Sequence, residues 1–189
     1  MAKIAFQQVT IIGTGLLGSS IGLALKRLQP APRVIGCDLD NNARREASGK
    51  KAVDKVTSNV VEAVRDSDLV ILATPVRAIE LVLRDIAPML QPGTVVTDTG
   101  STKRQILDWA AKYLPEGVSF VGGHPMTGRK TAGSGGPTAD LFTNAVYCIT
   151  PPPSADSKAV ENIVKMVEAF GSTPYFVEAD EHDGLVASI

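Results

Sequence analysis

VTIIGTGLLG, residues 9–18, decides the fold that we expect for this chain. The short β-branched run at 9–12 is typical of a strand buried on both faces of a parallel sheet. A glycine turn follows at once, and apolar residues from Leu17 to Leu28 then recur at helical spacing. Strand, turn and helix together make a βα unit of the kind that opens a dinucleotide-binding fold.

Short apolar runs alternate with helical patterns along the rest of the chain. Further strands are predicted at 34–37, 69–73, 94–97, 119–121 and 146–149. Helices are predicted around 76–86, 106–113 and 160–170. This alternation predicts an α/β fold, a doubly wound and mostly parallel sheet of the Rossmann type.

The glycines of the turn have different roles in a dinucleotide-binding fingerprint. Gly13 permits the tight turn, Gly15 lets the backbone approach a pyrophosphate, and Gly18 lets the helix pack on the strand. Leu16 and Leu17 complete the turn, and the start of their helix is expected to hold the phosphates. The fingerprint alone is a weak signal, because glycine-rich apolar segments are common.

Asp38 ends the second predicted strand, about 20 residues after Gly18, where an acceptor for the 2′-hydroxyl of an adenosine ribose is required. The alternative is a loop carboxylate that caps a helix starting near Asn41. A carboxylate at this place repels a 2′-phosphate, and no arginine directly follows it. We therefore expect NAD rather than NADP, with Arg44 and Arg45 keeping NADP as the less favoured alternative.

Thr74, Pro75 and Val76 follow a third predicted strand. They lie at the carboxyl edge of the sheet, where open α/β sheets bind their ligands. Two interpretations are open: these residues contact the cofactor, or they only start the next helix, with Thr74 as cap and Pro75 in the first turn.

The segment TDTGSTK, residues 97–103, occupies the equivalent place after the next strand. Gly100 and Ser101 are candidate cofactor contacts there, although Ser101 also suits a helix N-cap. Lys103 would then lie in the first helical turn, where the helix dipole disfavours a cation by roughly a few tenths of a kcal/mol. We therefore expect an anionic or polar neighbour and count Lys103 among the candidate substrate residues.

The chain contains two histidines, and we expect different roles for them. His124 lies in a glycine-rich stretch, 122–137, that we expect to be a functional loop whose glycines let a ligand approach. A dehydrogenase needs a base for the hydroxyl proton, and His124 is the best candidate, the alternative being a loop histidine bonded to a carbonyl. His182 follows the expected helix cap Asp180, and we expect it to be solvated and structural.

Composition excludes several classes of function. The net charge is −1, with 19 Lys and Arg against 20 Asp and Glu, which argues against nucleic acid and membranes as partners. Cys37 and Cys148 end separate apolar runs, which indicates reduced core thiols and a cytoplasmic protein. The scattered Cys and His residues predict no metal site, and we find no targeting or membrane-spanning segment.

Taken together, these segments resemble the nucleotide-binding domain of the prephenate and arogenate dehydrogenase family. The matching residues are 9–18, Asp38, 73–75, 97–103, 122–126 with Gly128, 140–142 with 144–145, 150–151 and 181–183. The resemblance implies NAD-dependent oxidative decarboxylation of prephenate or arogenate, a step of tyrosine biosynthesis.

The same resemblance assigns roles to the candidate residues. His124 would bond to the ring hydroxyl and assist its deprotonation as the carbinol carbon gives a hydride to the nicotinamide. Ser101 would orient that hydroxyl or His124 and contact the nicotinamide end, while Lys103 would support the loop. Gly128 and Lys130 are further candidate substrate residues. A basic pair follows Gly128 where relatives often carry an acidic residue, so the choice between prephenate and arogenate stays open.

The resemblance also divides the chain. Residues 1–178 are expected to form the NAD-binding domain, and residues 179–189 to start an interdomain helix. Family members add a helical C-terminal domain that dimerises and supplies basic residues for the substrate, so we expect a homodimer through that missing domain and little activity from this chain alone. The competing interpretations are a β-hydroxyacid- or imine-type nicotinamide dehydrogenase or reductase, and a non-catalytic dinucleotide-sensing module.

Overall fold

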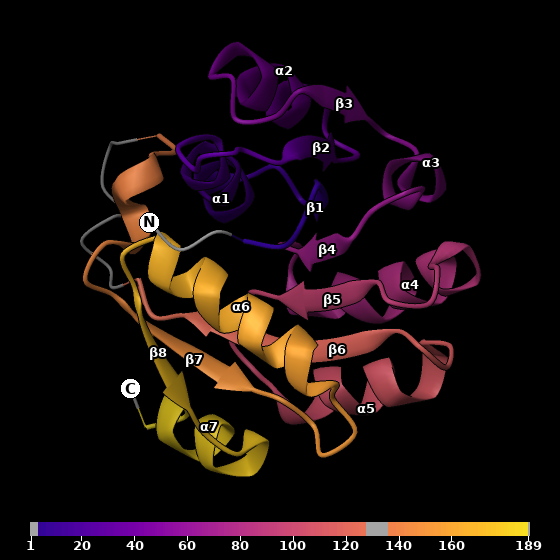
Figure 1. Ribbon diagram of the computed structural model, residues 1–189, viewed down its shortest axis with the longest axis vertical. Coiled ribbons are helices and arrows are strands. Elements are labelled where there is room, and N and C mark those ends of the chain that lie inside the picture. Colours follow the sequence, from indigo (N-terminus) through magenta and orange to yellow (C-terminus); the bar gives the residue numbers. More distant parts are fainter. Residues whose placement is uncertain (1–3, 128–135, 189) are drawn as a thin grey trace.

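The fold is a single twisted sheet with helices on both faces (Figure 1). The computed structural model describes residues 4–127 and 136–188. Its strands are β1 (Gln8–Ile12), β2 (Arg33–Cys37), β3 (Lys55–Thr57), β4 (Leu69–Leu72), β5 (Val95–Asp98), β6 (Ser119–Pro125), β7 (Val146–Thr150) and β8 (Thr173–Phe176). Its α-helices are α1 (Leu16–Lys26), α2 (Asn41–Gly49), α3 (Val60–Val64), α4 (Val76–Ile86), α5 (Arg104–Tyr113), α6 (Ser157–Ala169) and α7 (Ala179–Val186). Two short 3₁₀ helices, η1 (Ala87–Met89) and η3 (Ala139–Phe142), complete the described elements.

Within the described residues, the strands form one eight-stranded sheet in the order β3-β2-β1-β4-β5-β6-β7-β8. Neighbouring strands are parallel except β6 and β7, which run antiparallel. The predicted mostly parallel, doubly wound sheet is therefore confirmed. The strand order reverses between β1 and β4, which is the place where folds of this kind bind their ligand.

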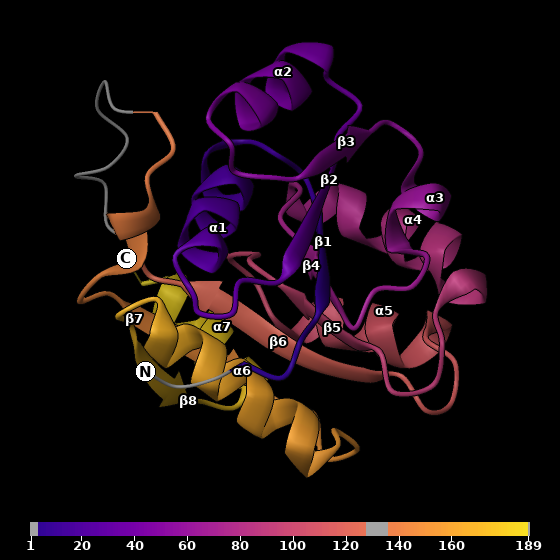
Figure 2. The same ribbon diagram turned by 45° about the horizontal axis from the view of Figure 1, so that its top comes forward.

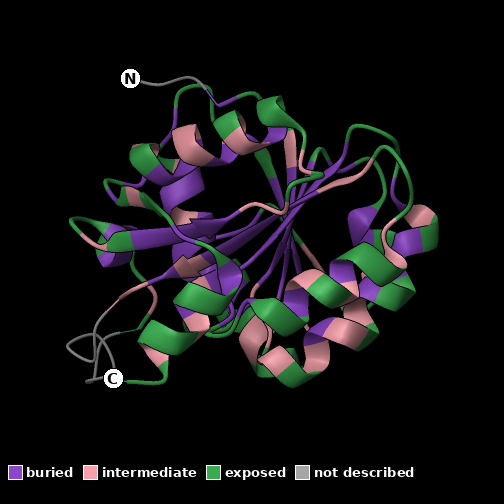
Figure 3. Ribbon diagram, turned by 90° about the horizontal axis from the view of Figure 1, so that it is seen from below, coloured by how far each residue is buried: buried purple, intermediate pink, exposed green. Residues whose placement is uncertain are grey.

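Each face of the sheet has its own hydrophobic core. On one face α1 and α6 bury residues such as Ile21 and Ile163, and on the other α4 and α5 bury Ile79 and Ile106. Figure 2 shows these two helix layers on opposite sides of the strands, and Figure 3 shows the strands as the buried centre of the molecule. Burial on both faces explains why the predicted strands are continuous apolar runs rather than alternating ones.

Besides the two 3₁₀ helices, the sequence analysis does not predict β3, α3 or β8, because each lacks the pattern that identifies longer elements. The strand β3 has three residues and α3 has five, which is too short for a clear period. The strand β8 contains Pro174 and is mostly exposed at the edge of the sheet, where proline is tolerated.

The prediction of a loop over 122–137 is wrong for its first residues. Residues up to Pro125 continue β6, because Gly122 pairs with Thr150 and His124 with Cys148 in the antiparallel ladder with β7. The glycines serve this packing rather than ligand approach, since a Cβ on Gly122 would lie 2.2 Å from the Thr150 hydroxyl. The rest of the predicted loop includes 128–135, which lie outside the described residues.

The predicted helix caps also differ from the structure. The N-cap of α4 is Pro75 rather than Thr74, and that of α5 is Lys103 rather than Ser101, so Lys103 precedes the first turn instead of lying in it. The N-cap of α7 is Glu178, which places Asp180 inside the helix. The helix ends at Val186, although we expected it to continue to the last residue.

Two further findings concern the described residues alone. Cys37 and Cys148 are both buried and free, as the sequence predicted. None of the helices there is long and apolar enough to cross a membrane.

Candidate active site

The glycine turn lies between the ends of β1 and β4. Gly13 has a φ of +94°, and a Cβ on it would lie 2.4 Å from the carbonyl oxygen of Ala73, at the end of β4. A Cβ on Gly18 would lie 1.9 Å from the carbonyl oxygen of Gly13. In contrast, a Cβ on Gly15 would meet no atom within 4 Å. Two of the glycines are therefore required by close packing, whereas Gly15 faces open space that a ligand can enter.

The first turn of α1 offers an anion-binding site. Gly15 is the N-cap, and neither a capping side chain nor an acidic residue of the first turn satisfies the free amides. Such amides, together with the positive end of the helix dipole, bind phosphate groups. Leu17 packs on the core and Leu16 is 38% exposed, so these two leucines can contribute their backbone amides to that site.

Asp38 reaches back to this turn. Its Oδ2 accepts a hydrogen bond of 2.7 Å from the amide of Thr14, and its Oδ1 accepts one of 2.9 Å from the amide of Asp40. The side chain that caps α2 is Asp40, so the interpretation of Asp38 as a helix cap is wrong. The Asp38 carboxylate is held beside the glycine turn, where a ribose acceptor is needed.

The Arg44 guanidinium is bonded to the backbone of the loop that follows β2. It donates hydrogen bonds of 2.6 Å to the carbonyl oxygen of Asp38 and 3.0 Å to that of Leu39. Both bonds come from the same guanidinium nitrogen, and the other terminal nitrogen donates to Oδ1 of Asn41 at 3.3 Å. The arginine that could have favoured NADP is thereby partly engaged.

A cavity of about 430 Å³ opens between these elements. It is lined mainly by apolar side chains, with Gly13, Gly15, Asp38, Thr74 and Pro75 among its lining residues. Leu39, which is 88% exposed, and Leu81, which is 51% exposed, also line this cavity.

The side chain of Thr74, which lines this cavity, suggests that a ligand binds there. Its Oγ1 is buried and has no hydrogen-bond partner among the described residues, and the N-cap Pro75 leaves the start of α4 without a capping side chain. An unsatisfied buried hydroxyl in a cavity wall calls for a partner. Val76, two residues after Thr74, packs on the core instead.

Asp98 and Lys103 form a fully buried ion pair between β5 and β6. The Asp98 carboxylate also accepts hydrogen bonds from the amides of Gly100, at 2.8 Å, and Gly123, at 3.0 Å. The Lys103 ammonium donates a further bond of 2.7 Å to the carbonyl oxygen of Gly123. Burial lowers the pKa of Lys103, and the Asp98 carboxylate opposes that shift. Asp98 is the anionic neighbour that the sequence analysis expected for Lys103. Because the pair is fully buried, a role of Lys103 in supporting the loop is favoured over contact with a substrate.

His124 lies near the carboxyl end of β6 and faces α7. Its Nδ1 is 2.9 Å from Nε2 of His182, and the two rings meet edge to face. Burial lowers the pKa of His124 to about 4, with Lys103 and His182 adding to the shift. The imidazole is therefore neutral at pH 7, which is the state that a general base requires.

The solvated role expected for His182 is wrong. The side chain is only 1% exposed, and its Nδ1 lies 2.8 Å from Oδ1 of Asp183. The sequence carries one signal of this arrangement, the adjacent His182 and Asp183. Their contact with His124 depends on how α7 packs, which the spacing does not show.

The remaining candidates are placed as follows. Ser101 is exposed three residues after β5 and forms no side-chain hydrogen bond with the described residues. Gly100 is buried, and a Cβ on it would lie 2.7 Å from Cδ1 of Ile106 and 2.9 Å from Oδ2 of Asp98, so a larger residue would press on these two side chains. Gly128 and Lys130 lie outside the described residues. In the described part of the chain, no group of three or more His, Cys, Asp or Glu side chains could hold a metal ion.

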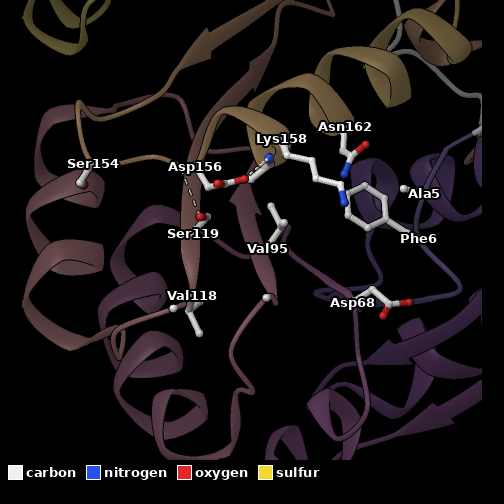
Figure 4. Close-up of a pocket in the computed structure, with 13 residues that line it drawn as sticks. Ala5, Phe6, Asp68, Val95, Val118, Ser119, Ser154, Asp156, Lys158 and Asn162 are labelled. Atoms are coloured by element: carbon white, nitrogen blue, oxygen red, sulfur yellow. Dashed lines mark hydrogen bonds between the residues drawn. The ribbon is translucent and has the colours of Figure 1, made fainter.

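A larger cavity, of about 590 Å³, lies at the opposite edge of the sheet (Figure 4). Asp68 and Ser119 line it at the amino ends of β4 and β6, and Lys158 and Asn162 line it from α6. The Asp68 carboxylate accepts hydrogen bonds from the backbone amides that start β1, so the fold already satisfies it. Because open α/β sheets bind ligands at the carboxyl ends of their strands, we place the site in the smaller cavity.

Comparison with known proteins agrees with this geometry. Residues 21–175 match the family model described as the nucleotide-binding domain of prephenate dehydrogenase. The chain is 35% identical to the prephenate dehydrogenase of Bacillus subtilis, an alignment that covers 96% of this chain and 49% of that protein. It is 32% identical to the cyclohexadienyl dehydrogenase of Zymomonas mobilis, with 96% of this chain and 62% of that protein covered.

The structural comparison points to the same group. The crystal structure of prephenate dehydrogenase from A. aeolicus, in complex with hydroxyphenyl propionate and NAD+, superposes with a TM-score of 0.87 at 25% identity. The match covers 97% of this chain and 64% of that one. The chain thus spans about half to two-thirds of the length of these relatives.

Proposed function

The chain belongs to the prephenate dehydrogenase family, whose nucleotide-binding domain it matches, and from this we propose that the protein carries out oxidative decarboxylation of prephenate or arogenate with NAD. The observation that carries the proposal is His124, a neutral imidazole at the carboxyl edge of the sheet beside the segment that carries Ser101. In this role the protein contributes to tyrosine biosynthesis.

The residues around the cavity fit a dinucleotide. The free amides at the start of α1 would hold the pyrophosphate, with Gly15 leaving room for it. Asp38 would accept the ribose 2′-hydroxyl, and its charge would repel the extra phosphate of NADP. The unpartnered hydroxyl of Thr74 would bond a polar group of the cofactor, and Gly100 and Ser101 would lie toward its nicotinamide end. The bound cofactor supplies the hydride acceptor.

His124 would then act as the general base. It would take the proton of the ring hydroxyl while the carbinol carbon gives up a hydride, and loss of carbon dioxide would yield the aromatic ring. Ser101 would orient the substrate hydroxyl from the neighbouring strand end. The proton thus ends on the imidazole, which is neutral and ready to receive it.

The proposal extends to the rest of the protein. Residues 1–178 would form the NAD-binding domain, and 179–189 would begin a helix leading to a dimer-forming helical domain, in line with the greater length of the relatives. Gly128 and Lys130 stay candidate substrate contacts. The two buried free thiols support a cytoplasmic protein.

Replacing His124 by Asn in the complete natural protein should lower kcat on prephenate by about a hundredfold or more, because general-base catalysis contributes about that much. The Kd for NAD should stay unchanged, since His124 lies apart from the cofactor cavity. Steady-state formation of NADH measures the first quantity and fluorescence titration the second. A fall of tenfold or less would count against His124 as the base.

The competing interpretations are separated by the same assay. Turnover of a β-hydroxyacid or an imine, but not of prephenate or arogenate, would favour a related dehydrogenase or reductase. Binding of NAD without any turnover by the complete protein would favour a sensing module. Relative kcat/KM values for prephenate and arogenate would identify the preferred substrate.

Asp38→Asn should weaken NAD binding by about tenfold or more, because a hydrogen bond to a charged acceptor contributes about 1.5–3 kcal/mol. The ratio of NADP affinity to NAD affinity should rise at the same time, since the repelling charge is gone. Titration with each cofactor measures both effects. Asp40→Asn, at the exposed cap of α2, is the matched control and should change neither affinity. An unchanged affinity for NAD in Asp38→Asn would contradict the assignment.

A further inference from the structure

Three side chains form a continuous hydrogen-bonded row from α7 to β6. Asp183 Oδ1 lies 2.8 Å from Nδ1 of His182, and Nε2 of His182 lies 2.9 Å from Nδ1 of His124. The central residue of the row, His182, is 1% exposed, so water does not compete for its ring nitrogens. The row ends at Nε2 of His124, the ring nitrogen that His182 does not engage.

The hydrogen bonds of this row determine which nitrogens carry protons. A carboxylate only accepts, so His182 must donate its Nδ1 proton to Asp183. In a neutral His182, which has one donor and one acceptor, Nε2 then carries the lone pair. That lone pair accepts the Nδ1 proton of His124. By the same rule, Nε2 of a neutral His124 then carries a lone pair, which is the form that a base needs.

We propose that His182 and Asp183 are positioning residues, which hold His124 in the tautomer that presents an unprotonated Nε2 to the substrate hydroxyl. The proposal rests on the function proposed above for His124, and it adds how the fold prepares that residue. Without the acceptor on His182, nothing in the row would prevent the other tautomer, whose Nε2 proton would block the base.

Asp183 stays ionised at neutral pH, as this row requires. Partial burial by itself raises the pKa of Asp183, but the hydrogen bonds from His182 and from the amides of Arg104 and Lys103 outweigh it and lower the pKa. Among the described residues, the Lys103 ammonium also acts on His124, and it is paired with Asp98. After His124 has taken a proton, Asp183 would stabilise the positive charge through His182.

Asp183 also fixes the second half of the site. Its two oxygens accept the amides of Lys103, at 2.7 Å, and Arg104, at 3.0 Å, and so cap the start of α5. An ion pair between Arg104 and Asp180 strengthens the same contact between α5 and α7. The residues 99–103, with Ser101, lead directly into this helix end. One carboxylate therefore aligns the base and the segment that carries Ser101.

The tautomer can be measured without any catalytic assay. In this chain labelled with ¹⁵N, the imidazole shifts of His124 should show a protonated Nδ1 and an unprotonated Nε2 at pH 7. In His182→Leu, which removes the acceptor, the shifts should move toward a mixture of tautomers. In His182→Gln, whose amide offers a donor to Asp183 and an acceptor to His124, they should stay close to those of the unmodified chain. Glu181→Gln, at the exposed neighbouring position, is the control and should leave the shifts unchanged.

The kinetic test uses the same variants in the complete natural protein. His182→Leu should lower kcat on prephenate by about a hundredfold with little change in KM, since it removes both the preferred tautomer and the path through which Asp183 stabilises the protonated imidazole. His182→Gln should recover activity to within about tenfold. Equal losses in His182→Leu and His182→Gln with an unaltered tautomer would mean a merely structural role and would overturn the proposal.

Failure of the proposed function would look different. If His124→Asn keeps full activity, His124 is not the base, yet the ¹⁵N shifts still decide whether His182 sets its tautomer. A protonated Nε2 of His124 in the unmodified chain would overturn the inference whatever the activity.

Discussion

Lys103→Met is expected to lower the free energy of unfolding by about 3–5 kcal/mol, because it leaves the buried Asp98 carboxylate without its cation. Both side chains of the pair are fully buried, so water cannot replace the lost partner. Methionine has a similar length, which keeps the packing loss small. Urea denaturation of the chain measures the change.

The size of this effect separates a buried pair from an exposed one. Lys165→Met is the matched control, because Lys165 pairs with Glu161 on the exposed side of α6. It should cost at most about 1 kcal/mol, as surface ion pairs generally do. The double variant Asp98→Asn with Lys103→Met should lose less than Lys103→Met alone, since the stranded charge is then removed. A cost below about 1 kcal/mol for Lys103→Met would show that water reaches Asp98 and would contradict its burial.

Gly18→Ala is expected to destabilise the fold by about 3 kcal/mol or more, at the upper end of what overpacking costs. The added Cβ would lie 1.9 Å from the carbonyl oxygen of Gly13, which is backbone and cannot rotate away. The turn must therefore shift, and NAD binding should be lost with it. Urea denaturation and NAD titration measure the two losses.

Gly15→Ala should leave the stability of the fold nearly unchanged but weaken NAD binding. Its Cβ meets no atom within 4 Å, so the free energy of unfolding should change by less than about 0.5 kcal/mol, as at an ordinary surface position. The same methyl would stand where the pyrophosphate approaches the start of α1, and the Kd for NAD should rise by about tenfold or more. Gly49→Ala, at another position with open space, is the control for both measurements. If Gly15→Ala binds NAD normally, the pyrophosphate does not pass over Gly15.

Much of the fold follows from local spacing. Two-sided burial produces the apolar runs that become β1, β2, β4, β5 and β7, and the helical periods of α1, α4, α5 and α6 are equally clear. The elements that escape prediction are short, or lie at the sheet edge where burial imposes no pattern, as in β8. The prediction of a loop from residue 122 is wrong for another reason. The residue type of Gly122 and Gly123 suggests a loop. At both positions, however, a side chain larger than that of glycine would collide with β5 or β7.

The sequence by itself determined the βα unit around Gly13, Gly15 and Gly18 and placed Asp38, the proposed ribose acceptor, just after the second strand, because these depend on spacing along the chain. It also singled out His124 as a candidate base from its residue type and its place in the chain. Only the tertiary structure decided what His124 faces. His182 lies 58 residues away in the sequence, and it reaches His124 because Asp183 fastens α7 to the start of α5. Such a contact arises from how helices pack, and no local period or spacing encodes it.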